Sequence, residues 1–151
     1  MRKYLFLAIA LVASALVFTS CEKGNEPALQ GKVYHYKGMS DVRYGEAYEH
    51  EVYIAMEDNG KLTIKLVGVK ASKDAEPVNL YLYNGTWYVE EYEDHNWHIS
   101  CDVTPQLPSG KAPKDWESVD IDGWCNENMC DFDYHINGTT GAIFTGQRVN
   151  D

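Results

Sequence analysis

Apolar and polar residues alternate along much of this chain, which is the pattern of a β-strand with one buried face. Between residues 48 and 57, one set of alternate positions holds Tyr48, His50, Val52, Ile54 and Met56. A second alternating run, residues 62–66, follows the turn sequence Asp58-Asn59-Gly60. The two runs predict a β-hairpin.

The apolar pattern also selects the register of this hairpin. A two-residue loop at Asn59-Gly60 would place Ile54 opposite Lys65 and so mix core with solvent. A three-residue loop with Gly60 in the left-handed region keeps the apolar residues on one face. It predicts the pairs Met56 with Leu62, Ile54 with Ile64 and Val52 with Leu66.

A second hairpin is predicted around Asn84-Gly85, a dipeptide typical of two-residue type I′ turns. Such a turn would join a strand that contains Leu80 and Leu82 to one that contains Trp87 and Val89. It would pair Leu82 with Trp87 and Leu80 with Val89, which keeps one face apolar.

Further alternating runs predict strands over residues 32–37, 97–103, 130–136 and 141–148, the last after a turn at Asn137-Gly138. In the run 97–103, Trp97, Ile99, Cys101 and Val103 are expected to face inward. In total there are about eight strands in up-and-down order. We expect them to close into a small antiparallel β-barrel, because closure leaves no exposed edge strand. An OB-type barrel, which has fewer strands, is the alternative.

The long segment between residues 104 and 128 shows little strand pattern and contains Pro105, Pro108 and Pro113. Loops of this length inside a compact domain are often functional, so we expect residues 104–130 to form a loop insert that binds a partner. The contact residues expected in it are Trp116, Trp124, Asn126, Glu127, Asn128 and Met129. Alternatively, the two tryptophans fold back as a lid over the barrel mouth.

The first twenty residues have the organisation of a secretory signal peptide. Arg2 and Lys3 precede an apolar stretch, and the small residues Thr19 and Ser20 come before Cys21. We predict that Cys21 is lipidated and that residues 21–30 form a short polar tether to a domain over residues 31–151. The alternative is an ordinary secreted chain in which Cys21 joins a disulfide.

Lipidation of Cys21 leaves Cys101, Cys125 and Cys130, an odd number in an oxidising compartment. One disulfide and one free thiol is the simplest account. A bridge from Cys125 to Cys130 would close a tight four-residue loop, although the sequence leaves all three pairings open.

The composition fits one compact domain and limits the partners it can bind. The chain has 151 residues, of which 44% are hydrophobic, and a formal net charge of -10. Removal of residues 1–20 takes away two basic residues and makes the protein still more acidic. An acidic protein is not expected to bind nucleic acid, or anionic lipid beyond its own anchor.

No catalytic or cofactor motif is found in the sequence, so we expect a non-enzymatic protein without a cofactor or a metal. His95 and His98 could ligate a metal only if their segment curls, because strand residues three apart face opposite sides. A partial likeness to an EF-hand loop covers Ser118, Asp120, Asp122, Gly123 and Asn126, but Met129 stands where the bidentate glutamate belongs.

Three short segments resemble the calycin-like β-barrel lipoproteins of Bacteroidota. They are Phe18-Thr19-Ser20-Cys21, Gly31-Lys32-Val33-Tyr34 and Ile143-Phe144-Thr145-Gly146. The chain departs from true lipocalins in having Val33 where their tryptophan stands. The resemblance implies a lipid anchor in the outer membrane, on its surface or its periplasmic face.

Two functions are compatible with these observations. The organisation is similar to the potempins, which implies a monomeric surface lipoprotein that inhibits a secreted or outer-membrane peptidase through the 104–130 loop. The alternative is a calycin-type carrier of a small apolar or glycan ligand. The inward positions are bulky enough to fill a small barrel, which favours the protein partner.

Overall fold

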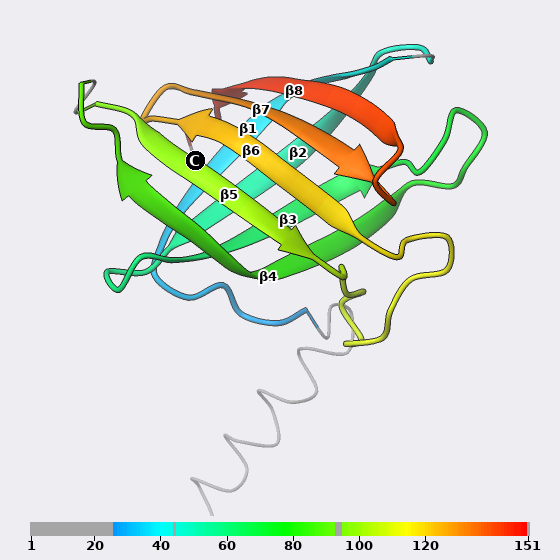
Figure 1. Cartoon of the computed structure of the whole chain (residues 1–151), viewed down its shortest axis with the longest axis horizontal. Coiled ribbons are helices and arrows are strands. Elements are labelled where there is room, and N and C mark those ends of the chain that lie inside the picture. The colour runs from blue at the N-terminus through cyan, green and yellow to red at the C-terminus, as the bar shows by residue number, and fades with distance from the viewer. Residues whose placement is uncertain (1–25, 44, 93–94, 151) are drawn as a thin grey trace, which may run out of the picture.

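The computed structural model describes residues 26–43, 45–92 and 95–150, which form a closed antiparallel barrel (Figure 1). Each strand pairs with its neighbours in the sequence, and β1 closes the barrel against β8. The strands are β1 (Lys32–Val42), β2 (Tyr48–Met56), β3 (Lys61–Val69), β4 (Val78–Val89), β5 (Trp97–Val103), β6 (Val119–Cys125), β7 (Met129–Ile136) and β8 (Thr140–Arg148). The predicted small eight-stranded barrel is confirmed, and the OB-type alternative is not.

The up-and-down order places the connections at two ends of the barrel. The turn end, on the left in Figure 1, holds residues 57–60, 90–92, 95–96 and 126–128. The loop end, on the right, holds residues 43, 45–47, 70–77, 104–118 and 137–139. These two names are used below.

The predicted register of the hairpin formed by β2 and β3 is confirmed. The structure pairs Met56 with Leu62, Ile54 with Ile64 and Val52 with Leu66. Gly60 has a φ of 83°, the left-handed conformation that a three-residue loop requires. A single buried face therefore decided the register, as expected.

The predicted hairpin at Asn84-Gly85 is wrong, because residues 78–89 form one continuous strand, β4. Asn84 does adopt the left-handed conformation, with a φ of 64°, but it forms a β-bulge. After the bulge, β4 still pairs with β3, and Gly85 lies opposite Leu62. The pairing register shifts between Leu62 and Ile64. The left-handed backbone of Asn84 thus bends the strand locally and does not reverse the chain direction.

The expected 104–130 loop is also corrected, because its second half contains a barrel strand. Strand β6 pairs along its whole length with β5 and β7, and Val119, Ile121 and Cys125 are buried. Only residues 104–118 remain as a long loop. The number of strands stays at eight because β4 replaces two predicted strands and β6 adds one.

Side chains from all eight strands fill the interior. The bulkiest fully buried aromatic side chains of the barrel interior are those of Tyr36, Phe132, Tyr134 and Phe144. Removing such apolar surface from water stabilises the fold by about 25 cal/mol per Å². The predicted inward residues Ile99 and Cys101 of β5 are among this core.

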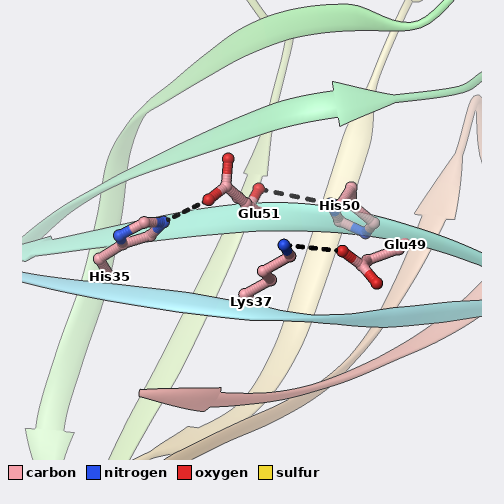
Figure 2. A network of polar contacts seen from close by, with 5 residues as sticks. All are labelled: His35, Lys37, Glu49, His50 and Glu51. Carbon is pink, nitrogen blue, oxygen red and sulfur yellow. Dashed lines mark hydrogen bonds and ion pairs between the residues drawn. The ribbon is translucent and has the colours of Figure 1, made fainter. Parts of the chain in front are cut away.

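The outer wall carries polar pairs between β1 and β2 (Figure 2). Glu51 accepts a hydrogen bond from His35 at 3.0 Å, and Glu49 pairs with Lys37 at 2.9 Å. His50, between the two glutamates, is 4% exposed and belongs to the interior. Successive side chains of β2 therefore face opposite sides of the barrel wall, with Glu49 and Glu51 on the outside and His50 on the inside.

The predicted signal peptide and Cys21 lie outside the described residues. Glu26, in the predicted tether, binds the ammonium of Lys65 on β3 and accepts a 3.3 Å hydrogen bond from Tyr81 on β4. The described part of the tether therefore contacts the outer wall of the barrel at Glu26. Within the described ranges, no helix is long and apolar enough to cross a bilayer.

Candidate functional site

The residues predicted to contact a partner fall at opposite ends of the barrel. Trp116 lies in the loop end, is 4% exposed and packs in the core, so it offers no surface to a partner. Trp124 is half-buried on β6, residues 126–128 form the turn from β6 to β7 at the turn end, and Met129 begins β7. The six residues therefore do not share one surface, and their contact with a partner stays a prediction.

The 104–118 loop is fastened to the barrel wall at its start. Gln106 forms an antiparallel bridge with Tyr81 of β4, and their backbone N–H groups donate bonds of 2.8 and 2.9 Å to each other's carbonyls. Leu107 packs against the core, and its N–H donates to the carbonyl of Lys111 at 2.8 Å. Residues 107–111 thus form a closed turn on a fixed base.

The return half of this loop is held by Asn137, at the turn from β7 to β8. Its side-chain oxygen accepts hydrogen bonds from the N–H groups of Glu117 at 2.7 Å and Ser118 at 3.2 Å. Its amide nitrogen donates to the carbonyl of Asp115 at 3.0 Å. Pro113 and Trp116 are buried between these contacts and the turn, so residues 109–112 form an exposed tip between two anchored legs.

At the turn end, two adjoining hollows open between the β4–β5 connection and the β6–β7 turn. The first, of about 640 Å³, is lined by Glu90, Tyr92, Asn96, Trp124 and Asn126. The second, of about 470 Å³, is lined by His95, Trp97, Asn126, Glu127 and Asn128. Asn126 belongs to both, so three of the predicted contact residues surround one continuous surface with Trp124.

The Asn126 side chain is locked by its neighbours. Its oxygen accepts hydrogen bonds from the N–H groups of Asn128 and Met129, both at 2.8 Å, and its nitrogen donates to Asn96 at 2.9 Å. The carbonyl of Asn126 accepts a bond of 2.5 Å from the hydroxyl of Tyr36, which comes from inside the barrel. These bonds tie the hollows to the core.

The cysteines of the predicted disulfide lie directly opposite each other on β6 and β7. Cys125 pairs with Cys130 in the ladder, both are fully buried, and both thiols are free in this structure. Burial, together with the adjacent Cys125 thiol, raises the pKa of Cys130 well above its usual value. The disulfide itself stays a prediction, and the two cysteines lie opposite each other as such a bridge requires.

Cys101 faces the core of the barrel as expected and stands opposite Ile121. Burial raises the pKa of its thiol to about 12. A thiol that remains protonated and buried is a poor nucleophile.

A chain of hydrogen bonds crosses the interior near the loop end. The N–H of Lys70 donates to the hydroxyl of Tyr48 at 3.0 Å, and that hydroxyl lies 3.3 Å from the hydroxyl of Tyr134. Tyr134 donates to Ser40 at 2.8 Å, and the Ser40 oxygen lies 2.6 Å from Nε2 of His50. Nδ1 of His50 faces the carbonyl of Glu51, which can only accept, so the neutral histidine carries its proton on Nδ1 and its Nε2 accepts from the Ser40 hydroxyl.

This serine–histidine pair has the spacing of a nucleophile and its base, but its surroundings are structural. Ser40 is 0% exposed, so its oxygen lies out of reach of a substrate. Burial lowers the pKa of His50 to about 4, and Nδ1 faces the carbonyl of Glu51 at 3.4 Å. The chain keeps buried polar groups satisfied and the histidine neutral.

Neither of the weighed metal-site patterns forms in the structure. Asp120 and Asp122 lie on the extended strand β6, where a calcium loop cannot curl. His98 is held between Glu90 at 3.2 Å and Asp122 at 3.0 Å, and Asp94 lies outside the described residues. Among the residues that the structure describes, no three potential ligands are grouped to hold a metal ion.

Sequence reasoning missed the part of the turn end that comes from the β4–β5 connection. Tyr92 is 91% exposed and lines the first hollow with Glu90 and Asn96. The available signal was an aromatic residue within an acidic run, residues 90–94.

The fold places the protein among the up-and-down antiparallel barrels, the class to which the eight-stranded lipocalins belong. No protein-family model and no curated protein matches the sequence. One similar solved structure is a crystal structure of a candidate outer membrane protein from Bacteroides fragilis, with 9% sequence identity and a TM-score of 0.49. The match covers 78% of this chain and 50% of that one, so this chain spans about half of its length.

Proposed function

We propose that this protein is a monomeric, non-enzymatic lipoprotein of the outer membrane that inhibits a peptidase through the tip of the 104–118 loop. The observation that carries the proposal is the exposed tip, residues 109–112, held between two legs that are each bonded to the barrel. Its partner would be a secreted or outer-membrane peptidase.

The anchored legs reduce the cost of binding. A flexible loop loses conformational entropy when a partner orders it, by about 0.5–1.5 kcal/mol for each side chain that becomes fixed. Here Gln106 and Asn137 already hold the two legs in place. A convex, preordered segment of this kind suits the concave cleft of a peptidase, and an interface of about 800 Å² per partner suffices for a stable complex.

The tether contact supports an arrangement in which both ends of the barrel remain accessible. Cys21 and Glu26 are five positions apart in the chain, so a lipidated Cys21 would lie within about 18 Å of the Glu26 site on the wall. Glu26 binds Lys65 on β3, which holds the pKa of that carboxyl below its usual value. The wall formed by β3 and β4 would then face the membrane, and neither end would be covered.

The interior does not favour the alternative of a ligand carried inside the barrel. Large side chains from all eight strands occupy it, including Tyr36, Phe132 and Phe144. A cavity at the loop end, lined in part by Val42, Tyr48 and Ala71, has a volume of about 90 Å³. Typical small-molecule sites measure about 300–1,000 Å³.

The experiment is a capture assay with the full chain on secreted and outer-membrane fractions, followed by titration of each captured peptidase. We expect stoichiometric inhibition. A deletion across residues 111–129 would remove β6 and unfold the barrel, so the test variant replaces only residues 108–112 with a glycine–serine segment of equal length. It should weaken inhibition at least roughly tenfold, because the tip loses its fixed conformation.

The matched control replaces residues 71–75 in the same way, since that segment belongs to another connection at the same end of the barrel. It should leave inhibition unchanged. The proposal fails if the protein captures no peptidase, or if the two replacements weaken inhibition equally.

A further inference from the structure

We propose that the two hollows at the turn end form a binding site for a neutral oligosaccharide. This site lies at the opposite end of the barrel from the proposed inhibitory tip and does not depend on it. The inference rests on the kinds of side chain that line the hollows, on how they are held, and on their charge.

Aromatic rings line both hollows. Tyr92 is 91% exposed and Trp124 is half-buried in the first hollow, and Trp97 lines the second. The flat faces of such rings bury apolar surface against the C–H faces of a pyranose ring, while Tyr and Trp each keep a polar atom for a hydrogen bond.

The polar groups around these rings match sugar hydroxyls. The amide side chain of Asn128 carries a donor and an acceptor, Asn96 carries an amide NH2 group, and Asn126 keeps a second N–H beyond the one it donates to Asn96, while a hydroxyl is both donor and acceptor. The carboxylates of Glu90 and Glu127 accept hydrogen bonds from neighbouring hydroxyls. A site with several amides and rings binds a polyhydroxylated ligand better than a purely apolar one, which would leave the amides unpaired.

The lining excludes an anionic ligand. The residues described around the two hollows include two glutamates and neither a lysine nor an arginine. The whole chain carries a formal net charge of -10, which repels phosphate, sulfate and uronate groups. A neutral sugar pays no such penalty.

The site is held in place before a ligand arrives. The Asn126 amide is fixed by Asn96 and by two backbone N–H groups. On the adjoining wall, the ring of Tyr88 stacks on His98 at 4.8 Å, and His98 stands opposite Trp124 in the ladder. A platform of rings therefore continues from the hollows along the outer face of β4, β5 and β6.

The size of the site favours a chain of sugars over a single one. The hollows of about 640 and 470 Å³ meet at Asn126, and each is within the range of small-molecule sites. A single ring would fill part of one hollow, whereas a linear oligosaccharide could contact Tyr92, Trp124 and Trp97 together.

The test is calorimetric titration of the full chain, purified in a non-glycosidic detergent, with neutral hexasaccharides. The probes are cellohexaose, maltohexaose, mannohexaose, xylohexaose and chitohexaose, with hexagalacturonate as the anionic comparison. We expect at least one neutral probe to bind with a Kd below about 1 mM and to quench tryptophan fluorescence, while hexagalacturonate does not bind.

Two variants locate the binding. Tyr92→Ala, at a fully exposed position, and Trp124→Ala should each weaken binding roughly tenfold, as expected for the loss of one stacking ring. The matched control is Ile143→Ala, which removes another exposed apolar side chain on β8 and should bind like the unchanged protein.

Three results would overturn the proposal: no neutral probe binds the folded protein, hexagalacturonate binds best, or both aromatic variants bind undiminished. The glycine–serine replacement of residues 108–112 should leave sugar binding unchanged. A failure of peptidase inhibition is therefore distinguishable from a failure of this site.

Discussion

Trp116 at the loop end and Trp124 at the turn end lie eight positions apart in the chain, yet they occupy different environments. Trp116 is 4% exposed and packs with the core, whereas Trp124 is half-buried and lines an open hollow. At the loop end, aromatic and polar groups are directed inward, as the chain from Tyr48 to His50 also shows. At the turn end, they are directed toward solvent.

The two ends of the barrel therefore differ in how they use their aromatic and polar side chains. The loop end buries Trp116 and a polar network beneath its exposed connections. The turn end keeps rings, amides and carboxylates accessible and fixes them through Asn126 and Tyr36. Substitution of the buried groups at the loop end should therefore change stability, whereas substitution of the exposed rings at the turn end should change the proposed sugar binding.

The largest effect is expected from the two tryptophans. Trp116→Ala should lower the free energy of unfolding by about 3–5 kcal/mol, since it leaves a large cavity in the core. Trp124→Ala, at a half-exposed position, should cost about 1 kcal/mol or less. Chemical denaturation of both variants measures the contrast, and equal losses would contradict the division between the ends.

The buried histidine should make the loop end sensitive to acid. The pKa of His50 is about 4 when folded, below its unfolded value, so the unfolded state binds more protons between about pH 6.5 and pH 4. Stability should therefore fall as the pH is lowered through this range, by up to about 3 kcal/mol.

The comparison that isolates this term is the pH dependence of unfolding in His50→Gln, which cannot take up the proton. Its stability should fall less steeply with acid than that of the unchanged protein. His135→Gln is the control, because that histidine is 49% exposed and pairs with Asp120 on the surface. An unaltered slope in His50→Gln would show that the buried histidine is not responsible.

The cysteine pair should provide a smaller, redox-dependent contribution at the turn end. Oxidation is expected to join Cys125 to Cys130, and the small loop so closed should add about 2 kcal/mol of stability. Peptide mass mapping of the oxidised protein identifies the pair, and denaturation with and without reductant gives the stability change. Cys101 should be recovered as a free thiol, and a bridge to Cys101 would contradict the register of β6 and β7.

Local sequence patterns predicted the strand register correctly where a single apolar pair distinguishes one register from another. The β2–β3 register followed from keeping Ile54 and Ile64 on one face, and Gly60 supplied the left-handed turn. Strand β6 was missed although Val119, Ile121 and Cys125 alternate with polar positions. Gly123 interrupts that apolar face, and the prolines before it favoured a loop.

The hairpin expected at Asn84 failed for a different reason. The dipeptide favours the same left-handed backbone in a type I′ turn and in a bulge, so local preference could not distinguish them. Pairing of Thr86 with both Lys61 and Ser100 decides the matter, because it keeps β4 in the barrel beyond the bulge. These contacts join residues that are distant in the sequence.

The antiparallel barrel, the acidic surface, the buried Cys101 and the pairing of β2 with β3 could be predicted, because each depends on composition or on a period-two pattern. The burial of Trp116, the partial exposure of Trp124 and the position of Tyr92 beside Trp124 could not. Burial and proximity depend on which strands become neighbours when the barrel closes. Closure of the barrel depends on the pairing of all eight strands, and no single segment of the sequence specifies it.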